Sequence, residues 1–186
     1  MKRGLTVILT LTIPDTERFD TYNQTFTIIK GGTFRFEHSL FTIAKWEYRW
    51  HVSYLHSLQT QTMTPEQEID YYLCMCLDDG FKEEHLTSEV VNELTNYIQN
   101  PATATKIAPS QNGNKQRITT SETLYGIMIM SSIPMEFQRW HLNRLLTLIS
   151  VVADYHAPKK KMTREEVLAQ NAKLNAERKA KYNTKG

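Results

Sequence analysis

Near the start of the chain hydrophobic and polar residues alternate with a period of two, which is typical of a β-strand. Residues 5–13, LTVILTLTI, predict a strand because every second side chain is aliphatic. Two further β-rich runs, TFTIIK at 25–30 and TFRFEH at 33–38, flank Gly31-Gly32, and such a pair favours a two-residue hairpin turn. We therefore expect residues 1–38 to form a small antiparallel sheet.

From Ser39 onward the pattern changes to helical spacing. Ser39 is a suitable N-cap for a helix over residues 40–50. Residues 64–77 begin with a capping box, and we expect their apolar face to consist of Ile69, Tyr72, Leu73 and Cys76. Further helices are predicted at 87–100, before Pro101, and at 121–133, with Ser121 as the cap. Residues 101–120 lack periodicity and predict a long loop.

Residues 134–155 predict one helix that starts at Pro134 and is apolar around most of its circumference. Its polar residues form a single narrow stripe: Arg139, Asn143, Thr147, Ser150 and Asp154. A helix of this kind is typically central and surrounded by its neighbours. We expect the structural core to include Trp46, Trp50, Trp140, His141, Arg144, Leu145 and Leu148.

Three polar residues near this helix raise the question of catalysis. His141 is in line with Leu145 and Leu148, which favours a hydrogen-bonded core histidine over a catalytic one. Arg144 follows Trp140 by four residues, so we expect its guanidinium to stack on the indole. No nucleophile, phosphate-loop or metal-ligand motif is present, so we expect a non-enzymatic protein with no catalytic site, metal or cofactor. An enzyme that uses His141, Arg144 or His156 is the alternative.

Length and charge indicate a body with an appended arm. The 186 residues suit one α+β domain, with a sheet at 1–38 and a helical part at 39–157, followed by a basic helical or disordered extension at 158–186. Residues 159–186 hold nine Lys and Arg against three Glu, a net charge of +6, whereas the preceding 158 residues hold 13 against 17, a net charge of −4. Cys74 and Cys76 are two residues apart and so point about 200° away from each other on a helix, which prevents a disulfide between them. No run of 18 apolar residues predicts a membrane span.

The extension has the composition of a partner-binding helix. Thr163 and Glu166 predict a capping box, and Val167, Leu168 and Leu174 give only a thin apolar seam. The candidate partner-binding residues are its cations: Lys159, Lys160, Lys161, Arg164, Lys173, Arg178, Lys179 and Lys181. A solvated tail and a nucleic-acid-binding tail are alternatives, although Tyr182 is the only aromatic side chain available for stacking on bases.

Five segments of the chain resemble a family of small tailed-bacteriophage proteins. These segments are FEHSLFTIAKWEYRW (36–50), TPEQEIDYYLCM (64–75), LTSEVVNELTNYI (86–98), WHLNRLLTLISVV (140–152) and APKKKMTREE (157–166). The resemblance covers nearly the whole chain, and its most specific motifs are WHLNRLL and EHS-L-x4-KWE. It implies a phage morphogenesis protein most like the tail assembly chaperones, which are non-enzymatic and sheathe the tape-measure protein until tail-tube subunits replace them.

The resemblance also implies partners and a location. The expected partners are phage structural or tape-measure proteins, in a homo-oligomer or multicopy assembly, with no membrane partner. The expected location is the host cytoplasm during assembly, or the virion if the chain is instead a structural component of the head, neck or tail. A nucleic-acid-binding protein that acts through the basic tail is the third possibility.

Overall fold

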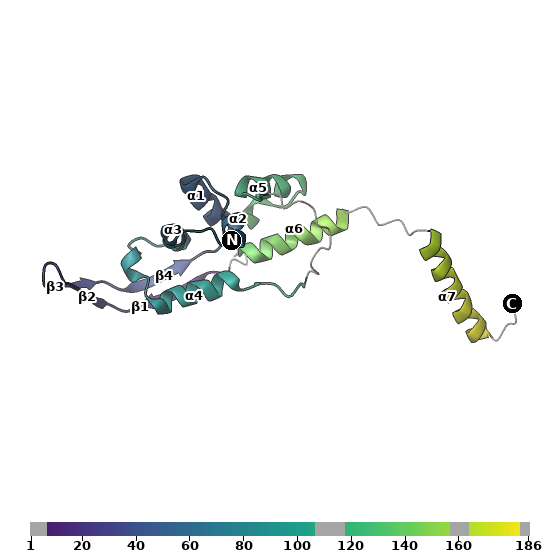
Figure 1. The fold of residues 1–186 in the computed structure, drawn as a ribbon, viewed down its shortest axis with the longest axis horizontal. Helices are drawn as coiled ribbons and strands as arrows, with labels where there is room; N and C mark the ends of the chain where they lie inside the picture. Colours follow the sequence, from purple (N-terminus) through teal and green to yellow (C-terminus); the bar gives the residue numbers. More distant parts are fainter. Residues whose placement is uncertain (1–6, 107–117, 157–163, 183–186) are drawn as a thin grey trace. The chain divides into compact units, whose positions relative to one another are not determined.

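A computed structural model describes residues 7–106, 118–156 and 164–182 of the chain (Figure 1). The predicted α+β class is confirmed, with four short strands first and the α-helices after them. The chain divides into two compact units, Met1–Ala153 and Asp154–Gly186, close to the predicted boundary at residue 157.

The strands of the first unit form a long two-stranded ribbon. β1 (Leu9–Ile13) pairs with β4 (Gly32–Phe36), and β2 (Thr16–Asp20) pairs with β3 (Thr25–Ile29), both in the antiparallel sense. The two ladders share one register, because Ile13 faces Gly32 and Thr16 faces Ile29. The predicted hairpin between residues 25–30 and 33–38 is therefore wrong: β3 and β4 follow each other along one side of the ribbon.

Gly31 interrupts the ladder instead of turning the chain. Its backbone N–H donates to Asp15 Oδ1 at 2.8 Å, and a Cβ placed on it would overlap the carbonyl of Ile13. Opposite it, Pro14 has no N–H to contribute to a ladder. The glycine signal therefore marks a close approach of two backbones, and the real turn lies at residues 21–24.

The capped helices occur where the sequence predicts them. Ser39 accepts a hydrogen bond from the N–H of Thr42, and Thr64 and Gln67 form the expected capping box. Thr120 caps the helix that was expected to start with Ser121 as its cap. The first five α-helices in chain order are α1 (Leu40–Trp50), α2 (Tyr54–Thr60), α3 (Pro65–Met75), α4 (Ser88–Gln99) and α5 (Ser121–Met130). A 3-10 turn, η1 (Glu83–His85), precedes α4, and neither it nor α2 was predicted.

The buried face of α3 differs from the predicted one. Ile69, Leu73 and Cys76 are only half-buried, and the inward side chains are Tyr71, Tyr72, Cys74 and Met75. A bridge between Phe36 and Cys76 joins the end of α3 to β4 and so fixes the rotation of the helix.

The predicted helix over 134–155 is broken near its start. Residues Met135–Arg139 form a 3-10 turn, η2, and the regular helix α6 begins only at Leu142 and ends at His156. Between them His141 forms a β-bridge with Ser39, and the N–H of Leu142 donates to the carbonyl of His38 at 2.8 Å. Only Leu142 and Leu145 of α6 are buried, so the prediction of a fully surrounded central helix is wrong.

The core is centred on α1 instead. Trp46 is fully buried, and its indole N–H donates to the carbonyl of Gln67 in α3 at 2.8 Å. The carboxylate of Glu47, itself buried, accepts hydrogen bonds from the N–H groups of Tyr54 and Ser121, the first residues of α2 and α5. It thus satisfies donors that two helix starts leave unpaired.

The second unit contains the helix α7 (Arg164–Tyr182), so the extension is helical over that range. The predicted capping residue Thr163 lies outside the described residues, as do Lys159, Lys160 and Lys161. Within the described ranges no helix has both the length and the apolar character required to cross a membrane.

A pair of glycine substitutions tests the ribbon geometry. Gly31→Ala is expected to lower the free energy of unfolding by about 2 kcal/mol, because its Cβ meets backbone that cannot move aside. Gly126→Ala is the matched control: it lies inside α5 with open space around its Cβ and should raise the free energy by about 0.5–1 kcal/mol. Urea unfolding of both variants measures the two changes. Equal, small effects would contradict the close approach at Gly31.

Candidate interaction site

The outer part of the ribbon exposes apolar side chains. Phe19 and Phe26 are 48% and 70% exposed, and their rings pack against each other at 4.9 Å. Ile28 is also exposed at 56%, and Tyr22, in the turn, is exposed at 93%. Figure 1 shows β2 and β3 reaching beyond the helices of the same unit. An apolar cluster at such a place marks a candidate protein-contact surface.

The same strands offer backbone edges. In the described part of the chain β2 and β3 pair only with each other, so each presents one row of N–H and C=O groups outward. Such edges pair readily with an extended segment of another protein. The ribbon therefore combines a backbone template with aromatic side chains.

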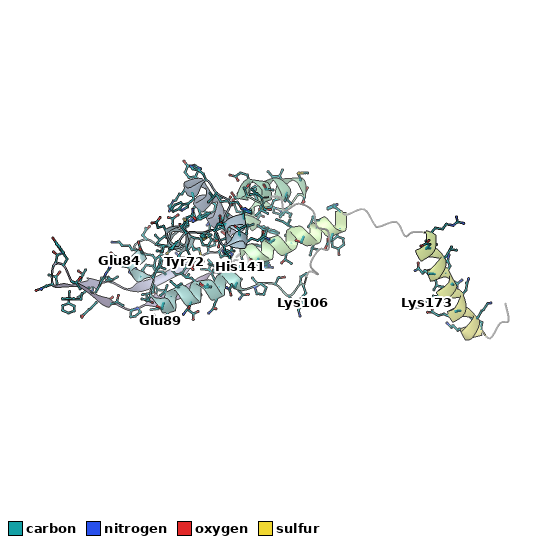
Figure 2. All side chains as sticks on the ribbon, viewed as in Figure 1. Tyr72, Glu84, Glu89, Lys106, His141 and Lys173 are labelled. Atoms are coloured by element: carbon teal, nitrogen blue, oxygen red, sulfur yellow. The ribbon has the colours of Figure 1, made fainter. Side chains whose placement is uncertain are left out.

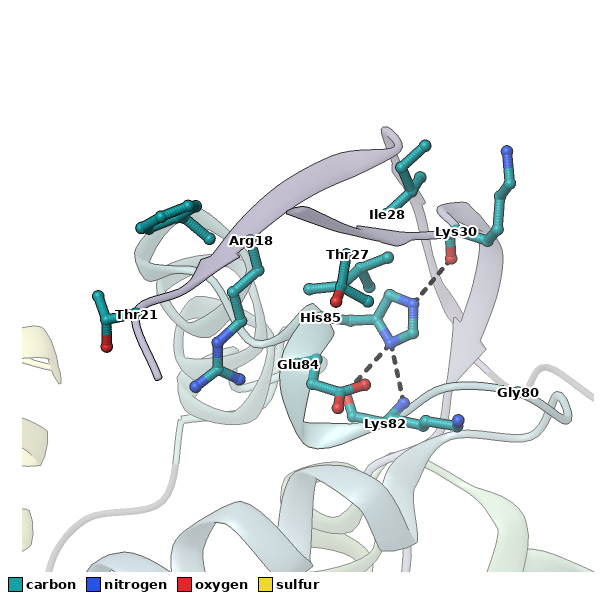
Figure 3. Close-up of a pocket in the computed structure, with 11 residues that line it drawn as sticks. Arg18, Thr21, Thr27, Ile28, Lys30, Gly80, Lys82, Glu84 and His85 are labelled. Atoms are coloured by element: carbon teal, nitrogen blue, oxygen red, sulfur yellow. Dashed lines mark hydrogen bonds between the residues drawn. The ribbon is translucent and has the colours of Figure 1, made fainter. Parts of the chain in front are cut away.

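A polar cavity of about 710 Å³ lies at the base of the ribbon (Figure 3). The N–H of Lys82 donates to Nδ1 of the buried His85, so Nε2 carries the proton and donates to the carbonyl of Lys30 at 2.9 Å. His85 thereby ties the start of η1 to the ribbon. Arg18, Lys30 and Lys82 line this cavity together with Glu84, which makes it more cationic than anionic.

A second cavity, of about 560 Å³, lies among α2, α3, α4 and the start of α6. We call it the helical groove. Its walls are mostly apolar, with Leu55, Leu58, Met63 and Ile98 among them, and its lining contains Glu68 but neither Lys nor Arg. The groove is thus apolar with one acidic side chain, whereas the cavity under the ribbon is polar and mainly cationic.

His38 lines the groove and belongs to a run of three buried polar residues, Glu37, His38 and Ser39. His38 Nδ1 and the Tyr71 hydroxyl lie 2.6 Å apart, and burial lowers the pKa of His38 to about 3. Ser39 donates to Glu37 Oε1 at 2.5 Å, and Arg139 donates to Glu37 Oε2 at 3.3 Å. The contacts of Tyr71 and Arg139 join segments that are distant in the sequence, and the contact between Ser39 and Glu37 lies at the N-cap of α1.

His141 is a core residue, as predicted. It is 1% exposed and lies among the side chains of the first unit (Figure 2). Its Nε2 donates to the carbonyl of Tyr97 at 2.9 Å, and its ring packs against that of His38 at 5.1 Å. Burial lowers the pKa of His141, and the hydrogen bond to the Tyr97 carbonyl partly opposes that effect. Its Nδ1 has no hydrogen-bond partner among the described residues.

The other predicted core residues divide into two groups. Trp46 and Leu145 are fully buried. The half-buried ones are Trp50, Trp140, Arg144 and Leu148. The Arg144 guanidinium lies 4.0 Å from the centre of the Trp140 ring, which confirms the predicted stacking. Both cysteines are free, and burial raises the pKa of Cys74 to about 11, so its thiol is held protonated.

The described cations of α7 do not share one face. Successive helical residues differ by about 100°, so Lys173 points about 180° away from Arg164, whereas Arg178 lies about 40° from Arg164. Lys179 and Lys181 continue the spread, and the Lys181 ammonium lies 5.7 Å from the Tyr182 ring. This arrangement is not the single basic stripe that follows a nucleic-acid backbone.

Comparison of the chain with protein-family models, curated proteins and solved structures found no match. Among the described residues, no three His, Cys, Asp or Glu side chains come together as metal ligands. The candidate site therefore rests on surface chemistry: the exposed ribbon, the helical groove and the arm.

Sequence reasoning missed the ribbon and the groove. The segment TERFD at 16–20 has three charged residues among its five and lacks an apolar alternation, yet it forms β2. The exposed Phe19 and Phe26 were available signals, since two aromatic residues equidistant from a polar turn face each other across a hairpin. The groove has no local signal, because its lining comes from five separate segments.

The buried histidines predict acid sensitivity. The pKa of His38 is lower in the folded chain than in the unfolded chain. As the pH falls below about 6.5, the unfolded chain therefore binds a proton at His38 and the folded chain does not. Stability should therefore be full at pH 7.5 and fall by about 2 kcal/mol by pH 5 from His38 alone. Urea unfolding across that window measures the slope.

The origin of the slope is tested with two variants. His141→Gln should reduce the slope because it removes a second buried imidazole, whereas His51→Asn, at an exposed histidine, should leave it unchanged. A free energy of unfolding that stays constant between pH 7.5 and 5 would contradict the buried neutral state of both rings.

Proposed function

We propose that the chain is a non-enzymatic bacteriophage morphogenesis protein that acts through protein–protein contacts, most like a tail assembly chaperone that sheathes the tape-measure protein. The observation that carries the proposal is the exposed apolar surface of the ribbon, formed by Phe19, Tyr22, Phe26 and Ile28. Strands that served only to complete the fold would not need exposed apolar side chains, so the apolar surface of β2 and β3 supports a role in contact with another protein.

The chemistry of the ribbon suits a long and varied partner. Backbone hydrogen bonds at a strand edge bind an extended segment with little dependence on its sequence, and flanking aromatic side chains add affinity. A protein that covers a tape-measure chain has to repeat one contact along many different sequences. An edge with aromatic side chains meets that requirement, whereas a deep specific pocket does not.

The resemblance to tail assembly chaperones rests on a different part of the molecule. Its motifs include Glu37, His38, Ser39, Trp46 and His141, all of which are buried. These residues build the scaffold, so the resemblance supports a common fold, and the ribbon supports the mode of contact. Within this proposal the cationic side chains of the arm remain candidate partner-binding residues.

Two substitutions in the ribbon test the proposal. In Phe19→Ser/Phe26→Ser the fold should persist because both side chains are exposed, but the tape-measure protein recovered after co-expression should fall about tenfold or more, as for the loss of an aromatic anchor. Tyr48→Ser removes an aromatic side chain that is 81% exposed on α1 and is the matched control.

The outcome is read by co-purification of the full chain and by the protein content of purified particles. Absence of the chain from particles together with tape-measure binding supports the chaperone. Abundance of the chain in purified particles would replace it with a structural virion component. Unchanged recovery of the tape-measure protein with the double variant would refute the ribbon as the contact surface.

A further inference from the structure

The helical groove and the arm helix have complementary surfaces. The groove is lined by apolar side chains, and its only charged side chain is the carboxylate of Glu68, because burial keeps the lining His38 neutral. We propose that helix α7 of one copy of this chain docks in the helical groove of a second copy. This inference does not depend on the proposed tape-measure contact.

The groove is shaped to accept aliphatic side chains. Leu58 remains 51% exposed on its rim, although α2 contributes to the core through Tyr54. Tyr72 and Ile98 form the opposite wall, and Asn143 donates from its side chain to the carbonyls of Ile98 and Asn100. Since the Asn143 amide is engaged within the body and most of the lining is apolar, an occupant has to supply mainly apolar surface.

The arm helix supplies such a surface. Val167 and Leu174 are seven residues apart, which places them on one side of α7 at a separation of about 10 Å. Both are exposed, at 41% and 42%. Arg178 and Lys181 continue the same side by one and two turns. The seam therefore begins with aliphatic residues and ends with cations.

Charge favours association between copies. Residues 1–158 carry a net charge of −4 and residues 159–186 carry +6, so the arm of one copy is attracted to the body of another. An isolated helix with so thin a seam is marginally stable in water, and burial of Val167 and Leu174 against a groove would stabilise it. Nucleic acid would neutralise the cations but would leave these two side chains exposed.

Docking of an arm in a neighbour's groove is a heterologous contact. Each copy then uses one arm and one groove, so copies join head to tail, in a closed ring or reciprocal dimer where the rotation closes and in an open chain where it does not. The arrangement would give a multicopy assembly from one interface.

Complementation between two defective variants tests this inference with the full chain. Val167→Asp/Leu174→Asp disables the arm but keeps the groove, and Leu58→Arg disables the groove but keeps the arm. Each variant alone should be monomeric in sedimentation velocity, whereas the wild type self-associates. An equimolar mixture should form a heterodimer, because it contains one intact arm and one intact groove.

Controls separate this from other causes. Leu168→Asp adds the same charge to an exposed position about 100° from Val167 and should leave self-association unchanged. The ribbon variant Phe19→Ser/Phe26→Ser should also self-associate normally, so loss of tape-measure binding and loss of self-association are separate results. Circular dichroism confirms that each variant is folded.

Three results would overturn the proposal. One is a wild-type chain that stays monomeric across the concentration series. Another is a mixture of the two variants that remains monomeric although the wild type associates, since that excludes the arm–groove contact. The third is an arm variant that loses DNA binding in a gel-shift assay while it keeps full self-association, which would assign the arm to nucleic acid.

Discussion

The arrangement of the first unit depends on the burial of three consecutive polar residues, Glu37, His38 and Ser39. Each is at most 3% exposed. A buried polar group without a partner costs on the order of 1–3 kcal/mol, so the chain has to bring partners to all three. Those partners come from α1, α3, α4 and η2, because Thr42, Tyr71, Tyr97 and Arg139 supply the hydrogen bonds. Satisfying this short segment therefore positions most of the helices.

The same requirement explains the residues that look catalytic. His141 lies beside the segment, bonded to the Tyr97 carbonyl, and Arg139 reaches the Glu37 carboxylate. Lys45 donates to the carbonyl of Cys74, so a cation of α1 also engages the end of α3. Polar side chains at these places form hydrogen bonds with groups that secondary structure leaves unpaired, and so they act as joints, that is, as side-chain links between separate elements.

Local signals made the helices predictable, whereas long-range pairing did not follow from the sequence. Ser39, Thr64 and Thr87 bond to backbone three residues away, so the sequence contains both partners of each cap. Gly31 has its effect through Ile13 on the opposite strand, and a turn signal could not reveal that partner. The start of α6 is likewise set by Ser39 and His38, which are more than a hundred residues away in the chain.

Burial of the joints also decides where contact with other proteins can occur. Residues such as Glu37 and Glu47 have their hydrogen-bonding groups engaged inside the body, so a partner gains nothing from them. Side chains that still have apolar surface to bury include Phe19 and Phe26 on the ribbon, Leu58 at the groove and Leu174 on the arm. Hydrophobic periodicity in a sequence reflects burial in the core, and an exposed side chain that contacts another protein does not have to follow it. Contact surfaces of this kind emerge only once the strands are paired and the helices are packed.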